Sequence, residues 1–116
     1  MNLSQIAEKL GLENLTPEKE LPGEEVRAGY ASDLLSDVLA NAPAGGVLVT
    51  VQVHLNVIAV AVHSGLAAVI FAADRRPEEP VRVKAMEEGV ALFVSPLPAF
   101  EIVGRLYQLG VSGQGR

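Results

Sequence analysis

The stretch that decides the fold is VLVTVQVHLNVIAVAVHSGLAAVIFAA, residues 47–73. Residues 47–53 alternate valine with other side chains, and this β-branched alternation is typical of a strand. Residues 54–63 are apolar and end at a Ser-Gly pair, which predicts a buried helix. The alternation also allows the strand to continue to Val57. Residues 66–73 form an apolar run that predicts a second, buried strand.

The chain beyond this stretch continues the same alternation. A helix begins at Pro77 or Pro80 and ends at Gly89, residues 90–94 are a third buried strand, and residues 98–109 form a helix. Strands that alternate with helices imply a mostly parallel sheet with helices on both faces. We therefore expect an α/β fold, a three-layer sandwich with a mostly parallel or mixed central sheet.

The residues before this stretch are less regular and are expected to add strands at an edge of the sheet. The predicted elements there are a helix over 3–10, a short strand over 12–16, a charged loop over 17–24, a strand over 26–30, and a helix from Ser32 or Asp33 to Asn41. We expect one domain over residues 1–111 and a flexible C-terminal tail over 112–116.

Composition narrows the class of protein. The chain has 116 residues, a net charge of −5 and no cysteine. Acidic and basic residues are mixed and no basic patch is present, so we expect no nucleic-acid partner. Without cysteine there is no disulfide, thiol nucleophile or cysteine metal site. Residues 55–73 form an apolar window that is roughly long enough to span a membrane. The polar residues inside it favour a buried helix and strand instead. We expect a cytoplasmic protein with no membrane partner.

Two Ser-Asp pairs stand one helical turn apart in GYASDLLSDVLANA, residues 29–42. Asp33 and Asp37 would share a helix face, where two carboxylates could hold Mg²⁺ with water. We favour the simpler interpretation that Ser32 and Asp33 cap the helix, because carboxylates in a first turn favour the helix dipole. We predict no metal site.

Polar residues follow the strand that begins at Val47. They are Thr50, Gln52, His54 and Asn56. Ligands of open parallel sheets bind outside the carboxyl ends of the strands, so these residues are candidates for ligand binding. Arg75 follows the next strand and could bind an anion. Together with Ser32 and Asp33 they make up the predicted site, although a structural role for His54 and an exposed turn at Arg75 remain alternatives.

Motifs for known cofactor chemistry are missing from the sequence. It contains no Gly-Lys-Ser/Thr phosphate loop, no G-x-G-x-x-G dinucleotide fingerprint and no His-Glu-x-x-His zinc motif. We therefore expect no kinase activity, no cofactor and no catalytic residue.

Two stretches carry a resemblance to a known family. GYASDLLSDVLANA followed by VTVQVHLNVIAVAV resembles the small DRTGG-domain proteins. A second stretch, RRPEEPVRVKAMEEGVALFVSPLPAFEIVGRLY at residues 75–107, is similar to the N-terminal domain of HPr kinase/phosphorylase. In that domain a Pro-Glu-Glu helix, a strand and a Thr-Pro-Leu or Ser-Pro-Leu turn recur in that order. The resemblance covers residues 22–109 and implies a non-catalytic α/β domain with a parallel or mixed sheet.

The chain also departs from that family. Where the family has Asp-Arg-Thr-Gly-Gly, this chain reads EVRAG, and only Gly29 matches. The separate domain that carries the phosphate loop in HPr kinase is absent, so the kinase activity does not transfer. DRTGG domains occur beside CBS domains and in phosphotransacetylases, which implies a sensing or assembly role.

We therefore expect a non-catalytic regulatory or ligand-binding module for a nucleotide or phosphorylated metabolite, a small anionic ligand. Two alternatives remain open: a small metal-dependent phosphohydrolase or transferase, and an interaction protein that docks on an enzyme complex. Because the chain is apolar for its size and residues 90–111 carry few charges, we also expect a homodimer through the last helix or an edge strand.

Overall fold

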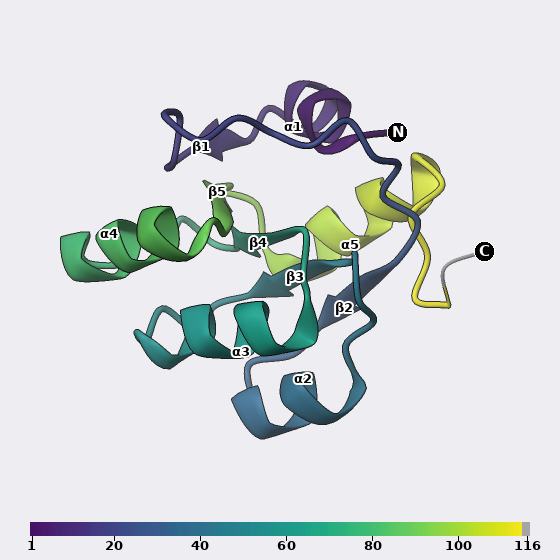
Figure 1. Cartoon of the computed structure of the whole chain (residues 1–116). Helices are drawn as coiled ribbons and strands as arrows, with labels where there is room; N and C mark the ends of the chain where they lie inside the picture. Colours follow the sequence, from purple (N-terminus) through teal and green to yellow (C-terminus); the bar gives the residue numbers. More distant parts are fainter. Residues whose placement is uncertain (115–116) are drawn as a thin grey trace.

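The computed structural model describes residues 1–114 and forms one mixed sheet with helices on both faces (Figure 1). The helices are α1 (Leu3–Leu10), α2 (Leu35–Asn41), α3 (Asn56–Ser64), α4 (Glu79–Glu88) and α5 (Ala99–Gln108). The strands are β1 (Glu13–Asn14), β2 (Gly29–Ala31), β3 (Val47–Thr50), β4 (Ala68–Phe71) and β5 (Ala91–Val94). The strand order is β1-β5-β4-β3-β2, with β1 antiparallel to β5 and all other pairs parallel. The expected three-layer α/β sandwich with a mixed sheet is confirmed.

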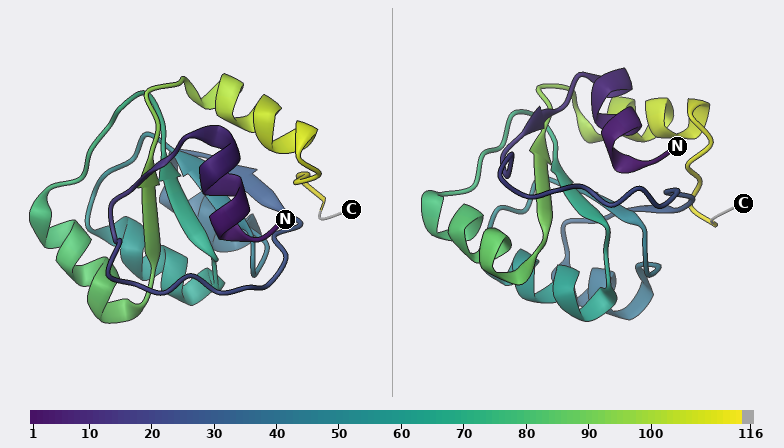
Figure 2. Two further views of the ribbon diagram at one scale, coloured as in Figure 1. Left: turned by 90° about the horizontal axis from the view of Figure 1, so that it is seen from above. Right: turned by 45° about the horizontal axis from the view of Figure 1, so that its top comes forward.

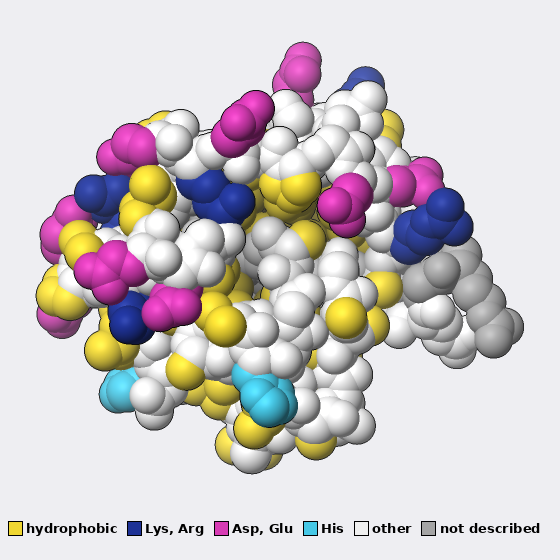
Figure 3. Space-filling view, viewed as in Figure 1, with side chains coloured by type: hydrophobic (Ala, Val, Ile, Leu, Met, Phe, Trp, Pro, Cys, Tyr) yellow, Lys and Arg dark blue, Asp and Glu magenta, His cyan; other side chains and the backbone are white. Residues whose placement is uncertain are grey.

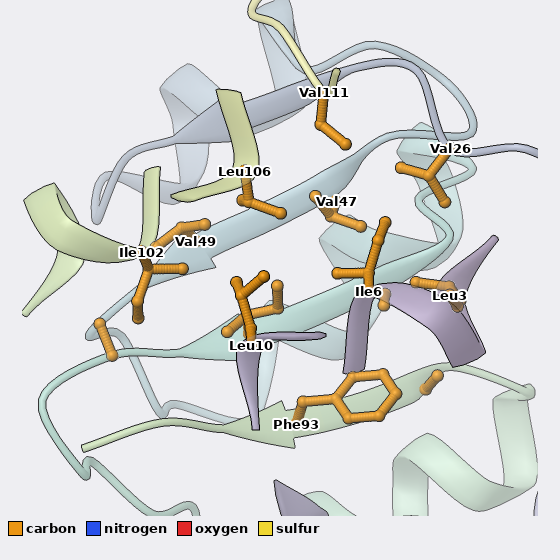
Figure 4. Packing of buried hydrophobic residues seen from close by; sticks show 14 residues of the cluster. Leu3, Ile6, Leu10, Val26, Val47, Val49, Phe93, Ile102, Leu106 and Val111 are labelled. Carbon is orange, nitrogen blue, oxygen red and sulfur yellow. The ribbon is translucent and has the colours of Figure 1, made fainter. Parts of the chain in front are cut away.

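Two hydrophobic cores lie on opposite faces of the sheet because its strand residues alternate between them. On one face, Leu3, Ile6 and Leu10 of α1 and Ile102 and Leu106 of α5 pack on strand residues that include Val47, Val49 and Phe93 (Figure 4). On the other face, side chains of α2, α3 and α4 pack on Leu48, Phe71, Leu92 and other strand residues. Figure 2 shows these two helix layers on either side of the sheet.

The stretch 47–73 forms the predicted strand, helix and strand, but β3 ends at Thr50 rather than at Val53. Polar side chains end the strand by binding backbone amides two residues further on. Gln52 N donates to Thr50 Oγ1, His54 N to Gln52 Oε1, and Asn56 N to His54 Nδ1. The apolar alternation of this segment was therefore a misleading signal for a longer strand.

The first strand is also shorter than predicted, for a similar reason. Thr16 is fully buried, and its hydroxyl accepts a hydrogen bond from Leu92 N of β5 at 3.1 Å. The Thr16 side chain thus binds β5 where the backbone of a longer β1 would otherwise pair with it. The strand predicted over 26–30 lies at Gly29–Ala31.

Two helices bury only a narrow face. On α5, Ile102 and Leu106 are buried, while Phe100 is 91% exposed and Tyr107 is 57% exposed. On α2, only Val38 is buried, while Leu39 and Leu34, which directly precedes the helix, are exposed. Both helices lie at the periphery of the molecule, where no other element of the described chain covers their outer sides (Figure 1).

The crossovers place α2, α3 and α4 on one face of the sheet, whereas α5 passes to the other. The loops after β4 and β5 therefore leave toward opposite faces, and this is the topological switch point of the sheet.

Within residues 1–114, no helix is long and apolar enough to cross a membrane.

The C-terminal end of the described chain runs beside β2. Ser112 N donates to Arg27 O, Gly29 N donates to Ser112 O, and Gly113 N donates to the Tyr107 hydroxyl. Residues 115–116 of the predicted flexible tail lie outside the described residues, and the flexibility of the tail stays a prediction.

Candidate functional site

The candidate site lies at the carboxyl edge of the sheet, where β2, β3, β4 and β5 end and the next helices begin. Asp33 joins the first two of these strand ends. Its Oδ1 accepts hydrogen bonds from the Thr50 hydroxyl at 2.9 Å and from Val51 N at 2.8 Å. Thr50 is buried, so its hydroxyl needs a partner inside the protein. Asp33 and Thr50 therefore lie side by side, as two of the predicted site residues, but their polar atoms bind each other rather than pointing to a ligand.

The expectation that Ser32 or Asp33 caps α2 is wrong. The helix begins at Leu35, and its N-cap residue is Leu34, which has no side-chain capping bond. Ser32 Oγ accepts from Leu34 N before the helix, and Asp33 reaches across to β3. The hydrogen bond of Asp33 with Thr50, seventeen residues away in the sequence, takes the place of a local cap. No local sequence pattern signals this bond.

Asp37, the second carboxylate, has a separate set of partners. The Tyr30 hydroxyl lies 2.8 and 2.9 Å from its two oxygens, and Asn41 Nδ2 donates to Oδ1 at 2.9 Å. Hydrogen bonds from Ser32, Tyr30 and Asn41 lower the pKa of Asp37 below its usual value. The same contact raises the pKa of Tyr30, which stays a hydrogen-bond donor. Asp33 and Asp37 therefore do not converge on one point, and among the described residues no group of His, Asp and Glu is placed to hold a metal ion.

His54 lines a groove of about 420 Å³ between the β3–α3 loop and the start of α4. Gln52, Val53, His54 and Leu55 form one side, and Glu78, Pro80 and Val81 form the other. Because Nδ1 of His54 accepts the Asn56 amide, the neutral ring carries its proton on Nε2. That N–H has no partner within the described chain and is available to a ligand. Asn56 uses its backbone, and its side chain is exposed.

The loop after β4 contains two strained residues that sequence reasoning missed. Ala73 and Asp74 have φ values of 54° and 55°, in the left-handed region that residues other than glycine rarely occupy. Hydrogen bonds hold them there, because Ala73 N donates to Leu97 O and Asp74 N donates to Ser95 O. This strain lies at the topological switch point, and strained backbone is often retained at functional sites.

Arg75 follows the strained pair and differs from the other arginines. Within residues 1–114, Arg27, Arg76, Arg82 and Arg105 all form ion pairs with carboxylates. Arg76 binds both oxygens of Glu13 at 2.9 Å, and these bonds together with Asp74 raise its pKa. Arg75 is exposed and forms no ion pair with any residue of the described chain. Acidic and basic side chains are otherwise interspersed, as Figure 3 shows around α4.

Comparisons with known proteins bear on the fold. No protein-family model matches the chain, and no curated protein matches it. Among solved structures, the chain is similar to the CBS and DRTGG domains of the regulatory region of Clostridium perfringens pyrophosphatase, crystallised with its activator diadenosine tetraphosphate. The TM-score is 0.67 at 15% identity, over 90% of this chain and 45% of that one.

This likeness shows the fold and supports a DRTGG-like arrangement. The chain spans less than half of the matched structure. The similarity to the N-terminal domain of HPr kinase/phosphorylase receives no support from it and stays a prediction.

Proposed function

We propose that this protein is a non-catalytic regulatory module that binds a nucleotide or a phosphorylated metabolite at the carboxyl edge of its sheet. The observation that carries the proposal is Arg75, which has no ion-pair partner among residues 1–114 and follows a strained loop at the switch point. An arginine in such a place suits a phosphate, because its planar donors match phosphate oxygens in pairs.

The groove at His54, on the same carboxyl edge of the sheet as Arg75, supplies contacts for the uncharged part of such a ligand. Val53 and Leu55 offer apolar surface, and the free Nε2–H of His54 offers a donor. Glu78 lines the groove three residues after Arg75 and forms no ion pair within the part of the chain that the structure describes. Its carboxylate would repel phosphate but would accept hydrogen bonds from sugar hydroxyls or a base amino group. The chemistry therefore favours a nucleotide, with phosphate at Arg75 and the nucleoside in the groove.

The structural neighbour adds support at the level of the fold. That protein is a regulatory region crystallised with a dinucleotide activator. We propose that this chain has a regulatory role as well. From its sequence we also propose that it is related to DRTGG domains and to HPr kinase/phosphorylase, and that it is cytoplasmic.

The two alternative functions are less well supported. A metal-dependent phosphohydrolase or transferase would need Asp33, Asp37 and His54 to act together, yet each aspartate is bound to different protein groups. A docking role on an enzyme complex would use exposed apolar surface, which α5 provides. Self-association through that surface is considered below.

A thermal-shift screen with ATP, AMP and diadenosine tetraphosphate tests the ligand proposal. A ligand at 100 times its Kd stabilises the folded state by about 2.7 kcal/mol, which corresponds to a rise in Tm of roughly 10 °C for a domain of this size. We expect such a rise with at least one of these nucleotides and no release of phosphate from ATP above a control without protein.

Matched variants connect the shift to the site. Arg75→Gln should weaken binding at least tenfold, whereas Arg27→Gln, which removes the same charge near the start of β2, should leave it unchanged. His54→Ala should also weaken binding, and His63→Ala should not. Equal losses in both arginine variants would mean that overall charge, rather than this site, holds the nucleotide.

A further inference from the structure

The outer side of α5 carries an aromatic surface that no described element covers. Phe100, Val103, Gly104 and Tyr107 form this surface, which we call the α5 face. Phe100 is 91% exposed and Tyr107 is 57% exposed. Figure 2 shows α5 at the periphery, with α1 beside it and nothing over its outer side. None of the four residues is charged, and neutral, aromatic-rich surfaces are typical of the centres of protein interfaces.

A hollow of about 260 Å³ opens beside the α5 face, between α5 and the edge strand β2. Its floor is formed by Gly29, Ala31 and Val49, and α5 contributes Val103, Leu106 and Tyr107 to its wall. Gly29 and Ala31 place little side-chain volume in this space. Apolar lining makes it a site for an apolar group rather than for water.

The projecting side chain of Phe100 and part of the lining of the hollow come from the same helix. Phe100 projects from the first turn of α5, and Val103, Leu106 and Tyr107 line the hollow three to seven residues later. A surface that carries both halves of a contact is complementary to itself, which is the property of an interface around a two-fold axis.

We propose that the α5 face is the dimer interface of this protein, with a second copy of the chain as its partner. The two α5 helices pack antiparallel around a two-fold axis near Val103 and Gly104. This arrangement places Phe100 of each chain opposite Tyr107 of the other, where its ring enters the hollow beside β2. At a rise of 1.5 Å per residue, Phe100 and Tyr107 lie equally far from that axis.

Gly104 and the charge of the protein favour this partner over an unrelated one. Glycine is a poor helix former, and a Cβ at position 104 would meet no atom within 4 Å, so packing within one chain gives no reason for a glycine here. A glycine at the axis lets two helix backbones approach closely. Each chain carries a net charge of −5. The four residues of the α5 face are uncharged, and Glu101 beside them is already paired with Arg105 at 3.2 Å, so two copies can meet there without bringing unpaired like charges together.

Sedimentation of the full chain at micromolar concentrations tests the proposal. We expect a species of roughly twice the 12.2 kDa chain mass. Phe100→Ala should raise the dimer dissociation constant at least tenfold, and Gly104→Arg should give a monomer. Leu34→Ala, at an exposed leucine directly before α2, should leave the dissociation constant unchanged. Because Phe100 is almost fully exposed, its removal should not alter the circular dichroism spectrum or the Tm of the monomer.

Cross-linking gives a second readout, because it traps the dimer covalently even when the two chains dissociate readily. The chain has no cysteine, so Gly104→Cys introduces a single thiol. Near a two-fold axis, two such thiols should form an intermolecular disulfide on mild oxidation, whereas Ser36→Cys on α2 should not. A monomer at all concentrations, or a dimer indifferent to Phe100→Ala and Gly104→Arg, would overturn the proposal. Neither result bears on nucleotide binding at the carboxyl edge.

Discussion

At the scale of single residues, Asp33 links the ends of β2 and β3. Its Oδ1 accepts from the buried Thr50 hydroxyl and from Val51 N. Without the carboxylate, these two donors lose their shared acceptor. We expect Asp33→Ala to lower the free energy of unfolding by about 1–2 kcal/mol, measured by urea denaturation.

A double-mutant cycle with Thr50→Val isolates the bond between the two side chains. We expect a coupling energy of about 1 kcal/mol. Ser36→Ala, at an exposed position with no side-chain hydrogen bond, serves as the control and should change stability by less than about 0.5 kcal/mol. Strictly additive effects of Asp33→Ala and Thr50→Val would show that the bond contributes nothing to stability.

Tyr30 and Asp37 form a second residue-scale contact, which predicts a pH dependence. Hydrogen bonds from Ser32, Tyr30 and Asn41 lower the pKa of Asp37 in the folded state. The bonds therefore stabilise the fold at pH values above the unfolded pKa, about 3.9, and this contribution is lost as the pH falls through the lower folded pKa.

Tyr30→Phe keeps the ring but removes the hydroxyl. We expect the pKa of Asp37 to move up toward its ordinary value, as followed by NMR titration of its carboxyl carbon. The variant should lose more stability at pH 7 than at pH 2.5. An unchanged Asp37 pKa in Tyr30→Phe would contradict the assigned role of this hydroxyl.

At the scale of elements, the loop after β4 is held in a strained form by the loop after β5. Ala73 is exposed and has a φ of 54°, so glycine would relieve strain there without loss of packing. We expect Ala73→Gly to raise the free energy of unfolding by about 0.5–1 kcal/mol. It should also weaken nucleotide binding several-fold, because the loop before Arg75 becomes less ordered.

Chemical denaturation and calorimetric titration measure these two effects separately. Ala44→Gly, in an exposed loop position without positive φ, is the matched control and should lower stability slightly. A loss of stability in Ala73→Gly equal to that in Ala44→Gly would show that the observed φ stores no strain.

The helices and strands from residue 47 onward could be predicted because apolar periodicity and Gly or Pro boundaries mark them. The candidate site was predicted only in part. As the strand order requires, four predicted residues lie at the carboxyl edge: Thr50, Gln52, His54 and Arg75. The hydrogen bond between Asp33 and Thr50 depends on tertiary placement and could not be predicted.

Strain at Ala73 and Asp74 has no sequence signal, since neither residue is a glycine. The exposure of Phe100 also escaped prediction, because the periodicity of α5 shows which residues share a face but not how wide its contact with the sheet is.

At the scale of the whole molecule, the two proposed surfaces are separate. The carboxyl edge of the sheet contains Arg75, the strained loop and the groove at His54, and the α5 face lies on the outer side of a peripheral helix. The groove at His54 and the hollow beside α5 share no lining residue, so we expect a dimer built through α5 to keep one nucleotide site in each chain.

The most direct test of the central claim is an amide NMR titration of the ¹⁵N-labelled protein with diadenosine tetraphosphate and, separately, with ATP. We predict that the resonances that shift belong to residues 52–56 and 73–79, and that Arg75→Gln weakens these shifts while Arg27→Gln does not. An absence of saturable shifts with both nucleotides, or shifts confined to residues outside the carboxyl edge, would contradict the assignment of the ligand site.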